Sequence, residues 1–138
     1  MTKPSFKAPK FSVAPAGDDD FLIESIEYNA EKNAYKVKYR MRKANRTYSE
    51  NYRLDVDFQV NAFGNMLRAA YNDDSLEEFD ETLLDGAVGR QFSGEIIHRK
   101  WDGNTYAGIN GYSYKPVKTL YSFVTPITNV SQDEDDIA

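Results

Sequence analysis

Residues 35–42 read YKVKYRMR, a run in which every second residue is basic and the residues between are aromatic or apolar. Successive side chains of a β-strand point to opposite faces of a sheet. The run therefore predicts a strand with an apolar inner face and four cations on its outer face. The inner residues are Tyr35, Val37, Tyr39 and Met41, and the outer residues are Lys36, Lys38, Arg40 and Arg42.

Two interpretations of this outer row stay open. The row continues into Lys43 and Arg46, and no acidic residue lies between Lys32 and Arg46. A row of one sign is typical of a track for a polyanion. Charges on the outer face of a half-buried strand are also ordinary, and lysine on an edge strand prevents aggregation. We favour the binding surface and retain the solvated face as its alternative.

The composition limits the class of protein. The chain has 138 residues, of which 41% are hydrophobic and 14% aromatic, which suits one strand-rich domain with tails. It has no Cys, so disulfides and thiolate zinc sites are excluded. No apolar run approaches the roughly 18 residues of a membrane span. Residues 1–17 lack the apolar centre of a signal peptide, so we expect a cytoplasmic protein without a membrane partner.

The formal net charge of −5 hides a segregation of charge along the chain. Acidic residues gather at 18–20, between 73 and 85, and at 133–136, whereas basic residues gather between 32 and 46. Such asymmetry says more about partners than the sum does. The acidic total therefore does not exclude a polyanion as the ligand.

Alternation, helical spacing and turn residues predict five strands, with a helix between the third and the fourth. Asp102-Gly103 marks a tight hairpin turn before the last strand. Ser75 and Glu78 have the spacing of a capping box and predict a short second helix there. The predicted strands are residues 21–28, 35–43, 47–54, 88–99 and 105–114, and the main helix is residues 60–71, with Asp57 as an alternative start.

This order predicts a mainly β fold, a five-stranded OB-fold (Greek-key) barrel with a helix between strands 3 and 4. A helix packed on an open antiparallel sheet would show the same order. Residues 1–19, with Pro4, Pro9 and Pro15, are expected to be a flexible lead. The OB-fold domain is expected at residues 20–125, and a disordered acidic tail at residues 126–138.

The sequence does not favour an enzyme. Its single histidine, His98, falls within a predicted strand, where a structural role is the default. No glycine-rich phosphate loop, nucleophile elbow or metal-binding spacing occurs. We therefore expect no catalytic residues, no metal and no cofactor.

Basic and aromatic residues alternate near the predicted hairpin. A positive groove with aromatic platforms is how single-stranded nucleic acid is held. Tyr114 shares its strand parity with Tyr106 and Tyr112 and is expected to face outward with them, whereas Tyr48 and Tyr52 could face the core or the solvent. The candidate stacking residues are Trp101, Tyr106 and Tyr112, assisted by Arg99 and Lys100.

The last residues offer a second kind of contact. Four acids and one apolar residue near the chain end are typical either of a solubilising tail or of a peptide that docks on a partner. The candidate docking residues are Asp133, Glu134, Asp135, Asp136 and Ile137.

The strand order and the ending DEDDIA resemble bacterial and phage single-stranded-DNA-binding proteins. Residues 63–70 and 84–107 are also similar to small phage proteins of replication and recombination modules. The resemblance implies a non-enzymatic phage protein that binds single-stranded DNA, with RNA not excluded and a homo-oligomer possible. It also implies that the tail docks on replication or recombination proteins. The alternative is a protein-binding adaptor or inhibitor that uses its acidic surface and tail.

Overall fold

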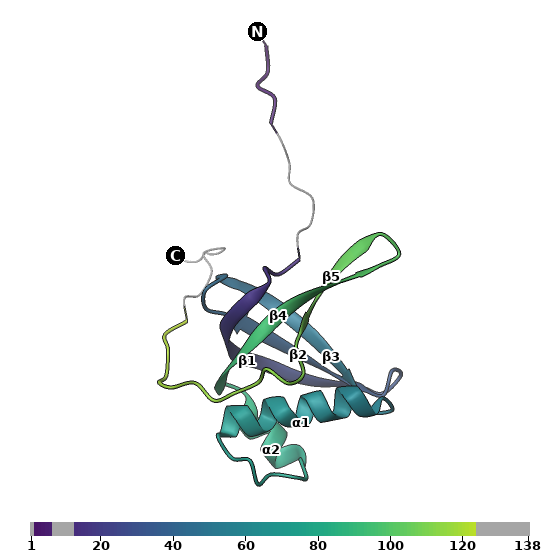
Figure 1. Cartoon of the computed structure of the whole chain (residues 1–138), viewed down its shortest axis with the longest axis vertical. Helices are drawn as coiled ribbons and strands as arrows, with labels where there is room; N and C mark the ends of the chain where they lie inside the picture. The colour runs from purple at the N-terminus through teal and green to yellow at the C-terminus, as the bar shows by residue number, and fades with distance from the viewer. Residues whose placement is uncertain (1, 7–12, 124–138) are drawn as a thin grey trace, which may run out of the picture.

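The computed structural model describes residues 2–6 and 13–123. They form five antiparallel strands in one sheet and two helices, and the sheet curls into a half-barrel (Figure 1). The mainly β architecture with a helical connection after the third strand is confirmed. The elements in chain order are β1 (Gly17–Asn29), β2 (Ala34–Met41), β3 (Arg46–Arg53), α1 (Asp57–Tyr71), α2 (Glu81–Ala87), β4 (Gln91–Trp101) and β5 (Asn104–Ile109).

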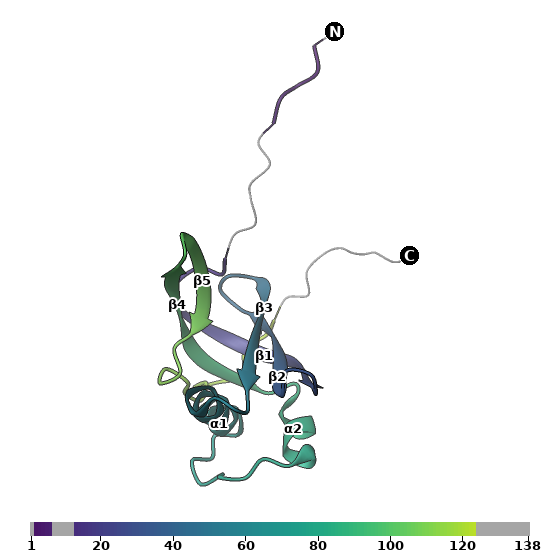
Figure 2. The same ribbon diagram turned by 90° about the vertical axis from the view of Figure 1, so that its right-hand side faces the viewer.

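The central strand of the sheet is β1, and the strand order is β3-β2-β1-β4-β5. Its first part pairs with β4, and its later part pairs with β2. The register with β2 shifts between Ile23 and Ser25, and such a bulge bends a strand and increases its twist. The long, bent β1 therefore belongs to both halves of the curled sheet, and α1 lies across one open end (Figure 2).

The core fills the space between the inner face of the sheet and α1. Val37, Tyr39 and Met41 are fully buried there, as the alternation of residues 35–42 predicts, and Tyr35 is partly buried against Phe63 of α1. The other large buried side chains include Phe21, Ile23, Tyr52, Met66, Leu67, Phe92 and Ile96.

Three tyrosines form a hydrogen-bonded chain through this core. The Tyr52 hydroxyl lies 2.8 Å from that of Tyr39 and 2.7 Å from that of Tyr114. Tyr52, which from the sequence could face either the core or the solvent, thus faces the core. The expectation that Tyr114 faces outward is wrong, because β5 ends at Ile109 and the following turn changes the strand parity.

The sheet begins earlier than the sequence predicts, because two buried aspartates of β1 accept hydrogen bonds from neighbouring strands and turns. Asp19 accepts hydrogen bonds from the backbone N–H groups of Lys43 at 2.7 Å and Ala44 at 3.0 Å, in the turn between β2 and β3. Asp20 accepts from the Arg42 Nε at 2.7 Å and from the Ser93 hydroxyl at 2.6 Å. These carboxylates stabilise strand pairing, so they are part of the fold and not of an acidic surface.

The helices differ from their predicted bounds for local reasons. Helix α1 starts at Asp57, the alternative start, and ends at Tyr71 as predicted, with Asn72 in a left-handed conformation after it. The second helix does not begin at Ser75, whose N–H and hydroxyl both donate to Asp73. Helix α2 begins later, where Asp80 caps it by accepting from the Leu83 N–H.

We expect Asp19→Ala to lower the free energy of unfolding by about 1–3 kcal/mol, because the Lys43 and Ala44 N–H groups of the β2–β3 turn lose the buried carboxylate that accepts from both. Urea denaturation measures the change. The matched control is Asp18→Ala, whose side chain is exposed, with an expected change within about 0.5 kcal/mol. Equal effects of the two substitutions would contradict the structural role of Asp19.

We expect Tyr114→Phe to lower the free energy of unfolding by about 1 kcal/mol, because it leaves the buried Tyr52 hydroxyl without one partner. Thermal or urea unfolding followed by circular dichroism checks this. Tyr112→Phe removes the same hydroxyl from an exposed neighbour and should be neutral. A loss for Tyr112→Phe as large as that for Tyr114→Phe would argue against the tyrosine chain.

Candidate nucleic-acid interface

The predicted row of cations on β2 divides into two exposed residues and two that are largely covered. Lys36 and Lys38 are exposed, whereas only 8% of Arg40 is exposed, and Arg42 is half-buried. Lys43, in the turn after β2, is exposed. The outward direction of the row follows the alternation of the strand, but two of its four members lie partly beneath the surface.

Acidic residues of β1 explain this division. Glu24 lies 3.3 Å from the Arg40 Nε and 3.9 Å from the Lys38 Nζ, because the bulge in β1 places Glu24 beside β2. Arg42 pairs with Asp20, and its guanidinium also lies 4.0 Å from the centre of the Tyr121 ring. Arg40 and Arg42 therefore serve strand pairing first, and the phosphate contacts predicted for them stay predictions.

The β4–β5 hairpin presents aromatic and basic side chains together. Asp102 and Gly103 both have positive φ, as the predicted tight turn requires. Arg99 and Trp101 share one face of β4 by alternation, and Tyr106 lies opposite Arg99 in the ladder. Trp101 is 74% exposed and Tyr106 is 49% exposed, and the hairpin projects beyond the rest of the sheet (Figure 1). This face of the hairpin has the composition of a stacking platform.

Tyr112 and Arg46 lie outside that face. Tyr112 is 86% exposed, but it stands in the loop after β5, where its neighbour Gly111 packs against Ala62 of α1. Arg46, at the start of β3, is half-buried beside Thr47. Lys100 is exposed and, by alternation, points to the face of β4 opposite Trp101.

The edges of β3 and β5 approach each other without a backbone ladder between them. Two side chains of β3 bridge this seam, which we call the β3–β5 seam. The Tyr48 hydroxyl donates to the Ala107 carbonyl at 3.1 Å, and the Ile109 N–H donates to Glu50 at 3.1 Å. The same hydroxyl lies 2.6 Å from Glu50, so its single proton is shared between the two acceptors, and Tyr48 turns toward the seam and not toward the solvent.

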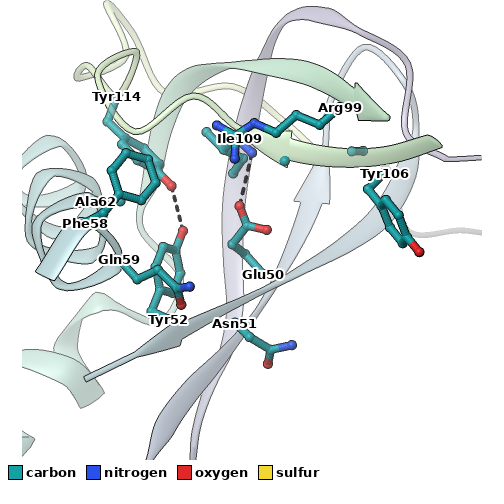
Figure 3. Close-up of a pocket in the computed structure, with 12 residues that line it drawn as sticks. Glu50, Asn51, Tyr52, Phe58, Gln59, Ala62, Arg99, Tyr106, Ile109 and Tyr114 are labelled. Atoms are coloured by element: carbon teal, nitrogen blue, oxygen red, sulfur yellow. Dashed lines mark hydrogen bonds between the residues drawn. The ribbon is translucent and has the colours of Figure 1, made fainter. Parts of the chain in front are cut away.

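A cavity of about 200 Å³ opens at the seam (Figure 3). Figure 3 shows Glu50 and Gln59 directed into the opening and Tyr106 at its margin, whereas the side chain of Asn51 leaves β3 on the opposite side from Glu50. The cavity is also lined by Arg99 of β4 and Phe58 of α1. Four of the lining residues were not predicted from the sequence, because nothing in their spacing shows that two distant strands and α1 meet there: Glu50, Asn51, Phe58 and Gln59.

Burial shapes the electrostatics of this cavity. Desolvation raises the pKa of the Glu50 carboxyl, although the hydrogen bonds from Tyr48 and the Ile109 N–H and the positive charge of Arg99 oppose the rise. Desolvation, together with the negative charge of Glu50, also raises the pKa of the Tyr48 hydroxyl, so Tyr48 remains a donor. The seam therefore combines a partly buried carboxylate with a nearby guanidinium.

Asn51 connects the two groups of predicted binding residues. A second hollow, of about 540 Å³, lies at the β1–β2 turn and is lined by Tyr28, Lys32, Lys36 and Asn51. Asn51 also lines the seam cavity with Arg99 and Tyr106. The hollow beside Lys36 and the seam cavity beside Arg99 thus meet at Asn51 of β3.

His98 has a structural partner. Its Nε2 lies 2.6 Å from the Ala14 carbonyl oxygen, which can only accept, so the ring donates and holds the segment before β1. Within residues 2–6 and 13–123, no cluster of side chains has the composition of a metal site. None of the helices described there is long and apolar enough to cross a membrane. The tail residues Asp133–Ile137 lie outside the described part of the chain.

Comparisons of the sequence with protein families and with curated proteins found no relative. No protein-family model matches this chain, and no curated protein sequence matches it.

Proposed function

We propose that this chain binds single-stranded nucleic acid, DNA in the first place, without catalysing a reaction. The observation that carries the proposal is the shared hairpin face of Arg99, Trp101 and Tyr106, with the exposed Lys36 on the far side of β3. An exposed aromatic face beside unpaired cations suits a flexible polyanion whose bases are free to stack.

The proposed fold is a variant of the OB-fold. Three antiparallel strands in sequence order, a helix, and a β4 that returns to pair with β1 support this assignment. In that fold the strand 2–3 face and the loops β1–β2 and β4–β5 bind oligonucleotides. Lys36, Asn51 and the β4–β5 hairpin belong to the same elements.

The contacts divide into two kinds. Bases would stack on Trp101, Tyr106 and Tyr112, each stack contributing about 1–3 kcal/mol. Phosphates would be held by the exposed cations, which give affinity without reading sequence. Arg40 and Arg42 would add positive potential beneath this surface, although Glu24 and Asp20 offset part of it. The proposed phosphate ligands are Lys36, Lys38, Lys43, Arg99 and Lys100.

The resemblance to phage proteins of replication and recombination modules supports a role in those processes, with the acidic tail docking on a protein partner. An adaptor or inhibitor is the second candidate. It is favoured by the exposed acidic residues between α1 and α2 and within α2, at the opposite end of the molecule from the hairpin (Figure 1).

We expect a fluorescently labelled oligo-dT to bind with a log–log salt slope of about −3.5, since five neutralised phosphates contribute about 0.7 each. Fluorescence anisotropy across a salt series measures it. Absence of binding at about 50 mM salt, or an affinity that salt does not change, would overturn the proposal. Capture of a protein partner through the acidic residues, without any binding of DNA, would support the adaptor instead.

We expect Trp101→Ala to weaken oligo-dT binding by about 1–3 kcal/mol, because one base loses its stacking platform. Since Trp101 is mostly exposed, the free energy of unfolding should change by no more than about 0.5 kcal/mol. Val88→Ala, which trims an exposed apolar side chain beside α2, is the control and should leave the affinity unchanged. Equal affinity of Trp101→Ala and the unaltered chain would remove the hairpin from the proposed site.

A further inference from the structure

Two polar groups that line the seam cavity have hydrogen-bond donors without a partner. Within the described residues, the guanidinium of Arg99 makes no hydrogen bond or ion pair. Gln59 uses its Oε1 to accept from the Arg53 N–H at 2.7 Å, which leaves its amide N–H groups available. Unpaired donors around one carboxylate indicate a site for a ligand that both donates and accepts.

We propose that the seam cavity holds the Watson–Crick edge of one cytosine of the bound strand. The inference rests on the proposed function and adds base preference to it. Stacking and phosphate contacts accept every base, whereas this cavity can distinguish one base from another by its hydrogen-bonding groups.

Glu50 supplies the acceptor. The donors Tyr48 and Ile109 N–H fix its two carboxylate oxygens, so the group is oriented before any ligand arrives. Each carboxylate oxygen can still accept a further hydrogen bond. An exocyclic amino group, such as N4 of cytosine, is the usual nucleobase partner of a carboxylate.

Arg99 supplies the donor. It lies close enough to Glu50 for its charge to act on that carboxyl, yet it forms no ion pair with it. Its N–H groups can therefore reach acceptors beside the amino group of a base, which in cytosine are N3 and O2. Uracil and thymine carry a carbonyl oxygen where cytosine has its amino group, so in the orientation described for cytosine they would place that oxygen against the Glu50 carboxylate.

The size and walls of the cavity suit a single aromatic ring. Its volume of about 200 Å³ falls below the range of about 300–1,000 Å³ of pockets for drug-sized ligands, as suits a single nucleobase. The half-exposed rings of Phe58 and Tyr106 line the opening and offer surfaces for stacking. A strand that passes over the hairpin would thus insert one base at the seam.

The test compares labelled oligo-dC and oligo-dU of about 15 nucleotides, a length that one OB-type domain can occupy. Anisotropy titrations of the full chain at neutral pH should show oligo-dC bound about tenfold more tightly. These oligonucleotides differ only at the amino edge and need no protein variant, so the comparison stands even if a substitution impairs folding. Equal binding of both overturns the inference and leaves the proposed function intact, whereas absence of binding to either overturns both.

Glu50→Gln then assigns the preference to the seam. A side-chain amide can present either its oxygen or its NH₂, so the affinities for oligo-dC and oligo-dU should converge to within about twofold. Glu78→Gln makes the same charge change at an exposed position between α1 and α2 and should keep the preference. A preference that persists in folded Glu50→Gln would place the discrimination elsewhere and overturn the inference.

Discussion

Tyr48 and Glu50 hold β5 to β3 with side chains, where a closed barrel would use a backbone ladder, and other features follow from that arrangement. The bridge satisfies a carbonyl and an N–H of the β5 edge that would otherwise lack partners. It also leaves space between the strands for the cavity. Because a buried carboxylate is costly without donors, the Tyr48 hydroxyl and the Ile109 N–H are as much part of the bridge as Glu50 itself.

Charge is distributed unevenly between the two ends of this acidic molecule. Three acidic residues of β1 make hydrogen bonds or ion pairs and so contribute to strand pairing: Asp19, Asp20 and Glu24. The exposed acids between residues 73 and 85 lie at the end opposite the hairpin (Figure 1). A polyanion would be repelled from that end and guided toward Arg99 and Lys100, an effect that depends on the ionic strength.

Local patterns of the sequence predicted the individual strands and turns better than the tertiary contacts between them. Alternation at residues 35–42 predicted the buried face of β2, and Asp102-Gly103 predicted the hairpin, since both signals act through the nearest backbone. The pairing of Arg40 with Glu24 was not predictable in the same way, because it depends on a bulge in another strand. Tyr114 was misplaced because parity was carried past the end of β5, and Glu50 was missed because the seam joins residues far apart in the chain.

A carboxylate in the path of a polyanion needs a reason to be there. Glu50 lowers the attraction for every phosphate nearby, so a surface selected only for affinity would place a neutral acceptor at the seam. Glutamine could accept from the Ile109 N–H without a charge, and it would avoid the desolvation that raises the pKa of Glu50. A charged acceptor strengthens the bridge to Tyr48 and Ile109, and in the proposed nucleic-acid site it would also penalise the wrong ligand, such as the carbonyl edge of uracil or thymine. If the chain binds nucleic acid as proposed, Glu50 would therefore give up some affinity for phosphates in exchange for discrimination between bases, in addition to its part in the bridge between β3 and β5.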